Sequence, residues 1–292
     1  MPNYEIRTTN YQNARKYLSS EVGEIGIGSD SCYRLVPEFE MLRELHHRTD
    51  KKVKLILPFV SQQYLAKAKA LLDKVNEERL SITIVVNDFG ILSYLSKIKD
   101  RAFELHIGRF MDWNYDLVPW SKNILRNEEY PDCFEQSSHI HDNKLKQYKN
   151  MRVSGIEAGY TKNINALGEY LLKNEIKLYV HYKYNVVALS RACPNRRLEQ
   201  GERCSEHCSR YQAFWFDRKW KPNNSFVSGQ TEYFKDEQLD KVFPKMYLKN
   251  NIVLRESEAC LDNLNTDFLT GIIVDDAILE KADPVADFIK GA

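Results

Sequence analysis

The sequence predicts an α/β protein, an irregular TIM-like (β/α)8 barrel, in a single domain over residues 1–292. Short apolar runs alternate with amphipathic segments of helical length, which is the pattern of a parallel sheet covered by helices. Seven or eight such units follow one another along the chain. A chain of 292 residues fits one large barrel domain or two smaller domains. Hydrophobic residues make up 43% of the sequence and aromatic residues 12%, which is enough for a sizeable core.

The first half of the chain alternates regularly. The apolar run at 22–28 predicts a strand, and Pro37 suits the first turn of the next helix, where a missing N–H costs little. Further strands are predicted from the apolar runs at 53–59, 81–86 and 103–108. The helices between them are predicted from apolar residues that recur on one face: Leu35, Phe39 and Leu42, then Leu65, Ala68, Leu72 and Val75.

The second half is less regular. Segment 111–150 is long, polar and aromatic, and we interpret it as an insertion, either a lid or a partner surface. Strands are predicted at 151–156, at 177–190 (one or two strands), at 251–256 and at 269–274. Two helices complete the pattern, one carrying Ile164, Leu167 and Leu171 and a closing one that starts at Asp283-Pro284.

Composition narrows the class of protein. The formal net charge is +1, which argues against a strongly electrostatic nucleic-acid binder. No apolar run approaches the roughly 20 residues of a membrane span, and the N-terminal residues lack the apolar core of a signal peptide. We therefore expect a cytoplasmic protein, whose six cysteines serve as ligands or plain thiols rather than disulfides.

The cysteines are the most specific feature. Cys193, Cys204 and Cys208 are spaced C-x10-C-x3-C with arginines between them, and Cys32 stands alone near the N-terminus. Cys32 follows the first predicted strand and Cys193 a later one, so a barrel would bring both to the mouth formed by the carboxyl ends of its strands. Four thiolates suit a 4Fe-4S cluster or, alternatively, a structural zinc ion, and unliganded thiols are the third possibility.

Other polar residues have a structural and a functional interpretation. Asn87 and Asp88 directly follow the strand at 81–86, where they either cap the next helix or belong to a site. His181 lies in an apolar strand, as a core residue or as a group facing the mouth. Arg34 and Arg191 stand beside cysteines, where they bind a carboxylated molecule or balance the charge of a cluster. Glu157 follows a predicted strand. It acts either as an acid or base, or it is a carboxylate that is solvated or caps a helix.

With these residues the chain resembles the UbiU/UbiV branch of the collagenase-like U-type peptidase family, and by length it is closest to the UbiV-like members. Four short segments carry the resemblance: Cys32-Tyr33-Arg34, Asn87-Asp88, Tyr179-Val180-His181, and Ala188-Leu189-Ser190 with Cys193 after two residues. Cys204 and Cys208 then follow in the family's order.

The resemblance implies a barrel that holds a 4Fe-4S cluster on Cys32, Cys193, Cys204 and Cys208. It implies oxygen-independent hydroxylation of an aromatic quinone precursor in ubiquinone biosynthesis, with prephenate as oxygen donor and a UbiU-like barrel protein as partner in a heterodimer. The expected catalytic residues are His181, Asn87 and Asp88, and the expected substrate-binding residues are Arg34 and Arg191.

Two alternatives stay open, a non-catalytic metal-binding scaffold for a related barrel and an RNA-base hydroxylase of the same family. The near-neutral charge disfavours the second. Peptidase activity is not expected, because the sequence has neither H-E-x-x-H nor G-x-S-x-G.

Overall fold

The computed structural model describes residues 3–111, 140–161, 164–190, 193, 211–214, 245–257 and 264–278. The chain divides into two compact units. The first comprises residues 1–113, 138–182 and 259–292, and the second comprises residues 114–137 and 183–258. Of the predicted insertion at 111–150, residues 112–139 lie outside the described residues, as does the predicted closing helix at 283.

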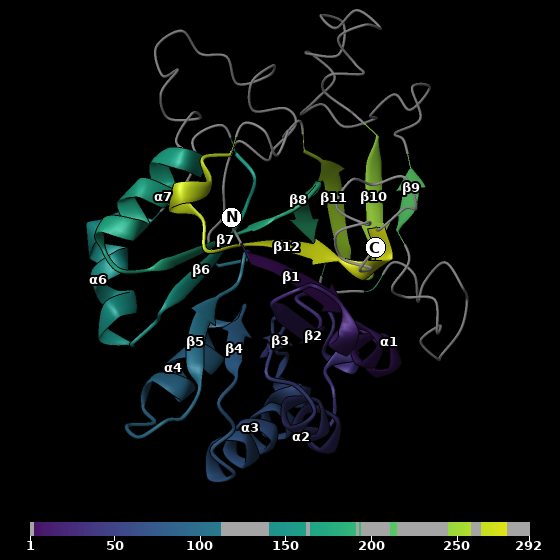
Figure 1. The fold of residues 1–292 in the computed structure, drawn as a ribbon, viewed down its shortest axis with the longest axis vertical. Coiled ribbons are helices and arrows are strands. Elements are labelled where there is room, and N and C mark those ends of the chain that lie inside the picture. The colour runs from purple at the N-terminus through teal and green to yellow at the C-terminus, as the bar shows by residue number, and fades with distance from the viewer. Residues whose placement is uncertain are drawn as a thin grey trace, which may run out of the picture. The chain divides into compact units, whose positions relative to one another are not determined.

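The first unit contains a closed barrel of eight parallel strands with helices between them, as the sequence predicts (Figure 1). Around the barrel the strands follow the order β1, β12, β7, β6, β5, β4, β3, β2. Their bounds are β1 Asn3–Thr8, β2 Glu24–Gly28, β3 Lys52–Leu57, β4 Thr83–Val86, β5 Glu104–Ile107, β6 Gly155–Gly159, β7 Lys177–His181 and β12 Gly271–Asp275. The α-helices in the described residues of this unit are α1 Tyr11–Lys16, α2 Phe39–His47, α3 Gln62–Glu77, α4 Phe89–Ser96, α6 Asp142–Asn150 and α7 Ile164–Lys173.

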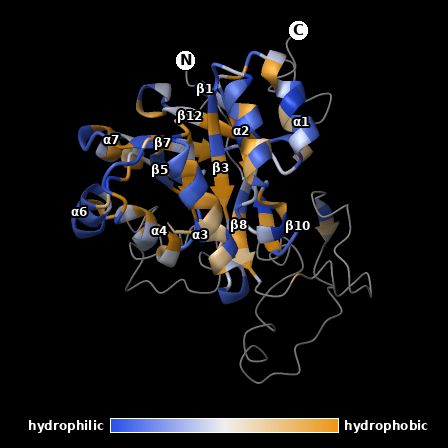
Figure 2. Cartoon of the chain, turned by 90° about the horizontal axis from the view of Figure 1, so that it is seen from below, coloured by the Kyte–Doolittle hydropathy of each residue, from blue (hydrophilic) through white to orange (hydrophobic). Residues whose placement is uncertain are grey.

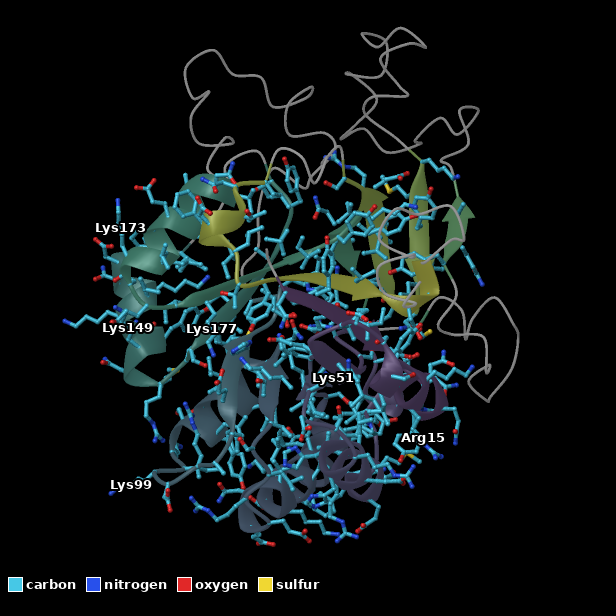
Figure 3. All side chains as sticks on the ribbon, in the orientation of Figure 1. Arg15, Lys51, Lys99, Lys149, Lys173 and Lys177 are labelled. Carbon is cyan, nitrogen blue, oxygen red and sulfur yellow. The ribbon has the colours of Figure 1, made fainter. Side chains whose placement is uncertain are left out.

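Each barrel strand presents two different faces, because successive side chains of a strand point to opposite sides. The outward residues, such as Ile6, Leu55 and Ile84, pack with the apolar faces of the helices in one buried hydrophobic cluster. The hydrophobic strands and the hydrophilic outer surfaces of the helices are visible in Figure 2. Lysines on the helices, for example Lys149 and Lys173, point away from the barrel (Figure 3).

The sequence did not predict β1, although this strand closes the barrel by pairing with both β12 and β2. Its apolar residues alternate with charged ones, Glu5 and Arg7, and the N-terminal segment therefore shows no apolar run. The charged residues face the barrel interior, where both are buried. An alternating pattern is normally the sign of a half-solvated strand, and here the polar face is enclosed instead.

The second unit contains a four-stranded antiparallel sheet in the order β8, β11, β10, β9. Its strands are β8 Tyr184–Leu189, β9 Gln212–Phe214, β10 Met246–Lys249 and β11 Ile252–Glu256. The run at 177–190 thus holds two strands: β7 belongs to the barrel and β8 belongs to this sheet. The expectation that Cys193 follows a barrel strand is wrong, because β8 pairs antiparallel with β11. A turn at Asn250-Asn251, with Asn250 at φ +57°, joins β10 to β11 and is a local signal for a hairpin.

Charged side chains fill much of the barrel interior, where branched apolar residues usually dominate. Lys54 Nζ lies 2.7 Å from Glu5 Oε2 and 2.6 Å from Glu24 Oε2, and all three side chains are at most 1% exposed. Arg7 Nη2 lies 2.6 Å from Glu5 Oε1 and 2.6 Å from Glu157 Oε1. These contacts join β3, β2, β1 and β6 through one set of buried ion pairs, which we call the interior network: Glu5, Arg7, Glu24, Lys54 and Glu157.

Glycines provide the room for these large interior side chains. A Cβ atom at Gly26 would lie 2.6 Å from Glu5 Oε1, and one at Gly155 would lie 2.6 Å from the His106 ring. Contacts this short require the neighbouring atoms to move. Gly26 and Gly155 therefore leave the space that the side chains of Glu5 and His106 occupy.

The interior network predicts that Lys54 is essential for stability. The variant Lys54→Met keeps the length of the side chain but leaves Glu5 and Glu24 buried without their ammonium partner. Breaking a buried ion pair by removing one partner typically costs about 3–5 kcal/mol, and we expect a loss of that order in the free energy of unfolding, measured by urea denaturation.

The matched control is Lys52→Met on the same strand, because the Lys52 side chain is 57% exposed and lies 3.9 Å from Glu24. This variant should stay within about 0.5 kcal/mol of the wild type. Equal losses in both variants would contradict a special role of the buried lysine.

Candidate functional site

The carboxyl ends of the barrel strands, together with the residues that directly follow them, form the barrel mouth. In parallel barrels the chemistry is located at this end. Polar residues of the mouth lie after β2, β4 and β5 and at the end of β7: Ser29, Asp30, Ser31 and Cys32, then Asn87 and Asp88, then Arg109, and His181. The ends of β1, β6 and β12 add Thr8, Thr161 and Asp275.

His181 is the last residue of β7, and its imidazole contacts the interior network. Its Nε2 lies 3.2 Å from Glu157 Oε2, and the side chains are 7% and 1% exposed. Arg7 holds the same carboxylate with two further hydrogen bonds, Nη2 to Oε1 at 2.6 Å and Nη1 to Oε2 at 3.0 Å. The three side chains come from β7, β6 and β1, which places a histidine, a carboxylate and a guanidinium in one buried group.

The protonation states follow from these contacts. Burial opposes ionisation of Glu157, but the Arg7 guanidinium and the hydrogen bond with His181 outweigh it and hold the pKa of Glu157 well below its ordinary value. Burial, reinforced by the positive charge of Arg109, lowers the pKa of His181 to about 4 against the pull of Glu157. At neutral pH the pair is thus a carboxylate and a neutral imidazole.

A second ion pair lies at the mouth. Arg109 follows β5 and reaches Asp30 after β2, with Nε 2.8 Å and Nη2 2.5 Å from the same oxygen, Oδ2. Both side chains are at most 10% exposed. Ser29 shapes the loop before Cys32, because its Oγ accepts hydrogen bonds from the backbone N–H groups of Ser31 and Cys32.

Asn87 and Asp88 hold the loops of the mouth together. Asn87 is buried, donates from Nδ2 to the carbonyl of Leu57 at 2.9 Å and accepts at Oδ1 from the N–H of Phe110 at 3.2 Å. Asp88 is the N-cap of α4 and also accepts from the N–H of Val60. The capping role that the sequence allowed for Asp88 is therefore observed, and Asn87 links the end of β3 to the segment that follows β5.

Two of the four predicted cysteine ligands are described. Cys32 is half-buried at the start of the short helix η2 (Tyr33–Leu35), directly after the β2 loop. Cys193 is half-buried in the second unit, and its Sγ lies 3.7 Å from the carbonyl oxygen of Asn250, to which it donates. Cys204 and Cys208 lie outside the described residues. The described ranges contain no group of three or more His, Cys, Asp or Glu side chains that could hold a metal ion.

Of the two arginines predicted to bind substrate, one is described and one is not. Arg34 in η2 is exposed, and its Nε lies 3.3 Å from the hydroxyl oxygen of Tyr64. Arg191 lies outside the described residues. The structure therefore places Cys32 and Arg34 on one loop of the mouth, and it assigns His181 to the same end of the barrel.

Sequence reasoning missed Arg7, Asp30 and Arg109, and it expected Glu157 to follow a strand. Glu157 instead lies within β6 and is completely buried, so the alternative of a solvated or capping carboxylate is wrong. The local signal was present, because Glu157 is the one charged residue in the run Gly155–Gly159. Its partner Arg7 stands 150 positions away, and only the closed barrel brings them together.

No protein-family model matches the chain, and no curated protein matches it. No helix in the described part of the chain is long and apolar enough to span a bilayer.

The buried state of His181 predicts a pH dependence of stability. An unfolded histidine titrates near pH 6.5, whereas the pKa of His181 in the folded chain is about 4. Between these values the unfolded chain binds a proton that the folded chain does not, so the free energy of unfolding falls as the pH falls from 6.5 towards 4.

The variant His181→Gln should reduce this slope by up to about 1.4 kcal/mol per pH unit, measured by denaturation between pH 7 and pH 5. The glutamine amide keeps a donor for Glu157. The control is His47→Gln, which removes an exposed histidine of α2. An unchanged slope in His181→Gln would show that this histidine does not titrate differently on folding.

Proposed function

We propose that the chain is an iron–sulfur protein and a subunit of an oxygen-independent hydroxylase for an aromatic, quinone-precursor-like substrate. A 4Fe-4S cluster would be ligated by Cys32, Cys193, Cys204 and Cys208. The observation that carries the proposal is this set of thiols: three lie within sixteen residues with arginines between them, and Cys32 lies at the start of η2, four residues after the barrel strand β2.

The chemistry of the donor set fits a cluster. Thiolates are the usual ligands of iron–sulfur clusters, and neighbouring arginines favour the thiolate form and offset the negative charge of the ligated cluster. When bound, the cluster supplies one-electron chemistry or polarises a nearby group. Four cysteine ligands leave no open iron position, so contact with the substrate falls to side chains of the protein.

The barrel mouth supplies groups for that contact. His181 offers a neutral imidazole, and Asn87 and Asp88 fix the loops around it. Arg34 and Arg191 are proposed to bind a carboxylated oxygen donor such as prephenate, since the guanidinium fork matches a carboxylate. The partner of this proposal is a UbiU-like barrel protein in a heterodimer.

The first test is anaerobic purification followed by metal, sulfide and spectral analysis. We expect a brown protein that absorbs near ~400 nm and contains about four irons and four sulfides per chain. A colourless protein with about one zinc per chain would replace the proposal by a structural metal site, and with it a scaffold role.

Single replacements test the ligands. Cys193→Ala should lose the visible absorption and the iron, because a cluster with one ligand removed is open to solvent and breaks down. Cys260→Ala is the matched control and should keep both. Unchanged iron and absorption in Cys193→Ala would exclude Cys193 as a ligand.

A further inference from the structure

The hydrogen bond between His181 and Glu157 fixes which nitrogen of the imidazole carries the proton. An ionised carboxylate can only accept hydrogen bonds. Because Glu157 Oε2 lies 3.2 Å from Nε2, Nε2 must be the protonated nitrogen. Nδ1 then carries a lone pair and is an acceptor.

The interior network holds this arrangement in place. Arg7 binds both oxygens of Glu157 and is itself bound to Glu5, which also contacts Lys54. The carboxylate therefore has no freedom to rotate away or to take up a proton without breaking a buried ion pair. The network extends over four strands and thus fixes one tautomer of His181 at the end of a fifth strand, β7.

Nδ1 is the ring nitrogen that Glu157 does not contact. It forms no hydrogen bond with any residue that the structure describes, yet it is not among the fully enclosed polar atoms that lack a partner. The side chain keeps 7% of its surface exposed. On the neighbouring strands the residues in register with His181 are Gly159, which has no side chain, and the apolar Ile273. Neither residue supplies a side-chain donor for Nδ1.

The charges around His181 disfavour a role as a base. Arg7 on β1 and Arg109 after β5 are both close enough to oppose a positive charge on the ring, and burial opposes it further. Glu157 on β6 acts in the other direction, while Asp30 and Glu5 are engaged with the two arginines. A proton transferred to Nδ1 would not be retained, whereas a hydrogen bond to Nδ1 needs no transfer.

We propose that His181 is a ligand-binding residue whose Nδ1 accepts a hydrogen bond from a neutral hydroxyl group of a phenol, with Glu157 and Arg7 as positioning residues. A phenolate or carboxylate oxygen is refused at this position, because it would bring a lone pair and a negative charge against the lone pair of Nδ1. The inference rests on the proposed function only for the aromatic class of the ligand; the acceptor follows from the contacts of His181.

The experiment uses the full chain, purified anaerobically and labelled with 15N-histidine. Nuclear magnetic resonance of the imidazole nitrogens reports the tautomer directly, and the spectrum of His181→Gln identifies the signals. At pH 7 we expect a protonated Nε2 and an unprotonated Nδ1. A protonated Nδ1, or a doubly protonated ring, would overturn the proposal.

The ligand class is tested in the same spectra with p-cresol and 4-methylanisole, which differ in the replacement of the hydroxyl by a methyl ether. p-Cresol should move the Nδ1 resonance and bind about tenfold more tightly, since one hydrogen bond is worth about that factor. Equal responses to the two compounds, or no response to p-cresol, would contradict binding through a hydroxyl donor.

The variant Glu157→Gln tests the positioning role. A glutamine amide can donate to Nε2 as well as accept from it, so the tautomer should become mixed and the preference for p-cresol should fall. A pure Nε2–H tautomer in a folded Glu157→Gln variant would show that Glu157 does not fix it. If that variant does not fold, the wild-type tautomer and the p-cresol comparison still decide the proposal.

Neither readout needs the cluster or turnover. A zinc-containing or metal-free protein that still prefers p-cresol would remove the proposed hydroxylase function and leave the acceptor role intact. A cluster-containing protein whose His181 is protonated at Nδ1 would keep the proposed function and remove the acceptor role of His181.

Discussion

The barrel is organised by the requirement that charges buried in its interior neutralise one another. Arg7 stands between Glu5 and Glu157, and Lys54 stands between Glu5 and Glu24. Such pairs often contribute little net stability against an apolar core, since desolvation offsets the attraction, but each one becomes costly when a partner is lost. The network therefore acts as a constraint on register. A β-strand displaced by one residue would turn its charged side chain towards the helices. The partner of that side chain would then remain buried without a counter-charge.

The same constraint reaches the mouth of the barrel. His181 has one direct polar partner among the described residues, Glu157, and that partner is held by Arg7. The state of the imidazole is thus set by residues on β1 and β6 rather than by its own strand. An acceptor fixed in this way loses little entropy when a ligand binds, because its orientation is already determined. The interior charges thus hold the barrel together and also orient the imidazole of His181 at the mouth.

The sequence predicted most of the barrel because seven of its strands contain apolar runs that form the outer, helix-facing layer. It did not predict β1, since the enclosed charges of that strand interrupt its apolar pattern. Nor did it separate β8 and β11 from the barrel, because the pairing of a strand depends on distant partners that a local run does not reveal. For the site, local patterns pointed to Cys32 and His181. They did not reveal the contact of His181 with Glu157, which joins the neighbouring strands β7 and β6 over 24 positions, or that of Glu157 with Arg7, which joins β6 to β1 over 150 positions.

The charges at the mouth also determine where neutral and anionic groups of a ligand can bind. Arg7 is engaged with two glutamates and Arg109 with Asp30, so neither offers an uncompensated positive charge to an anion. The inner part of the mouth is therefore suited to a neutral polar group. Under the proposed function, an anionic group of the substrate or oxygen donor must lie further out, where Arg34 is exposed beside Cys32. The hydroxyl at His181 and the carboxylate at the rim would then fix an aromatic ring between them by its two ends.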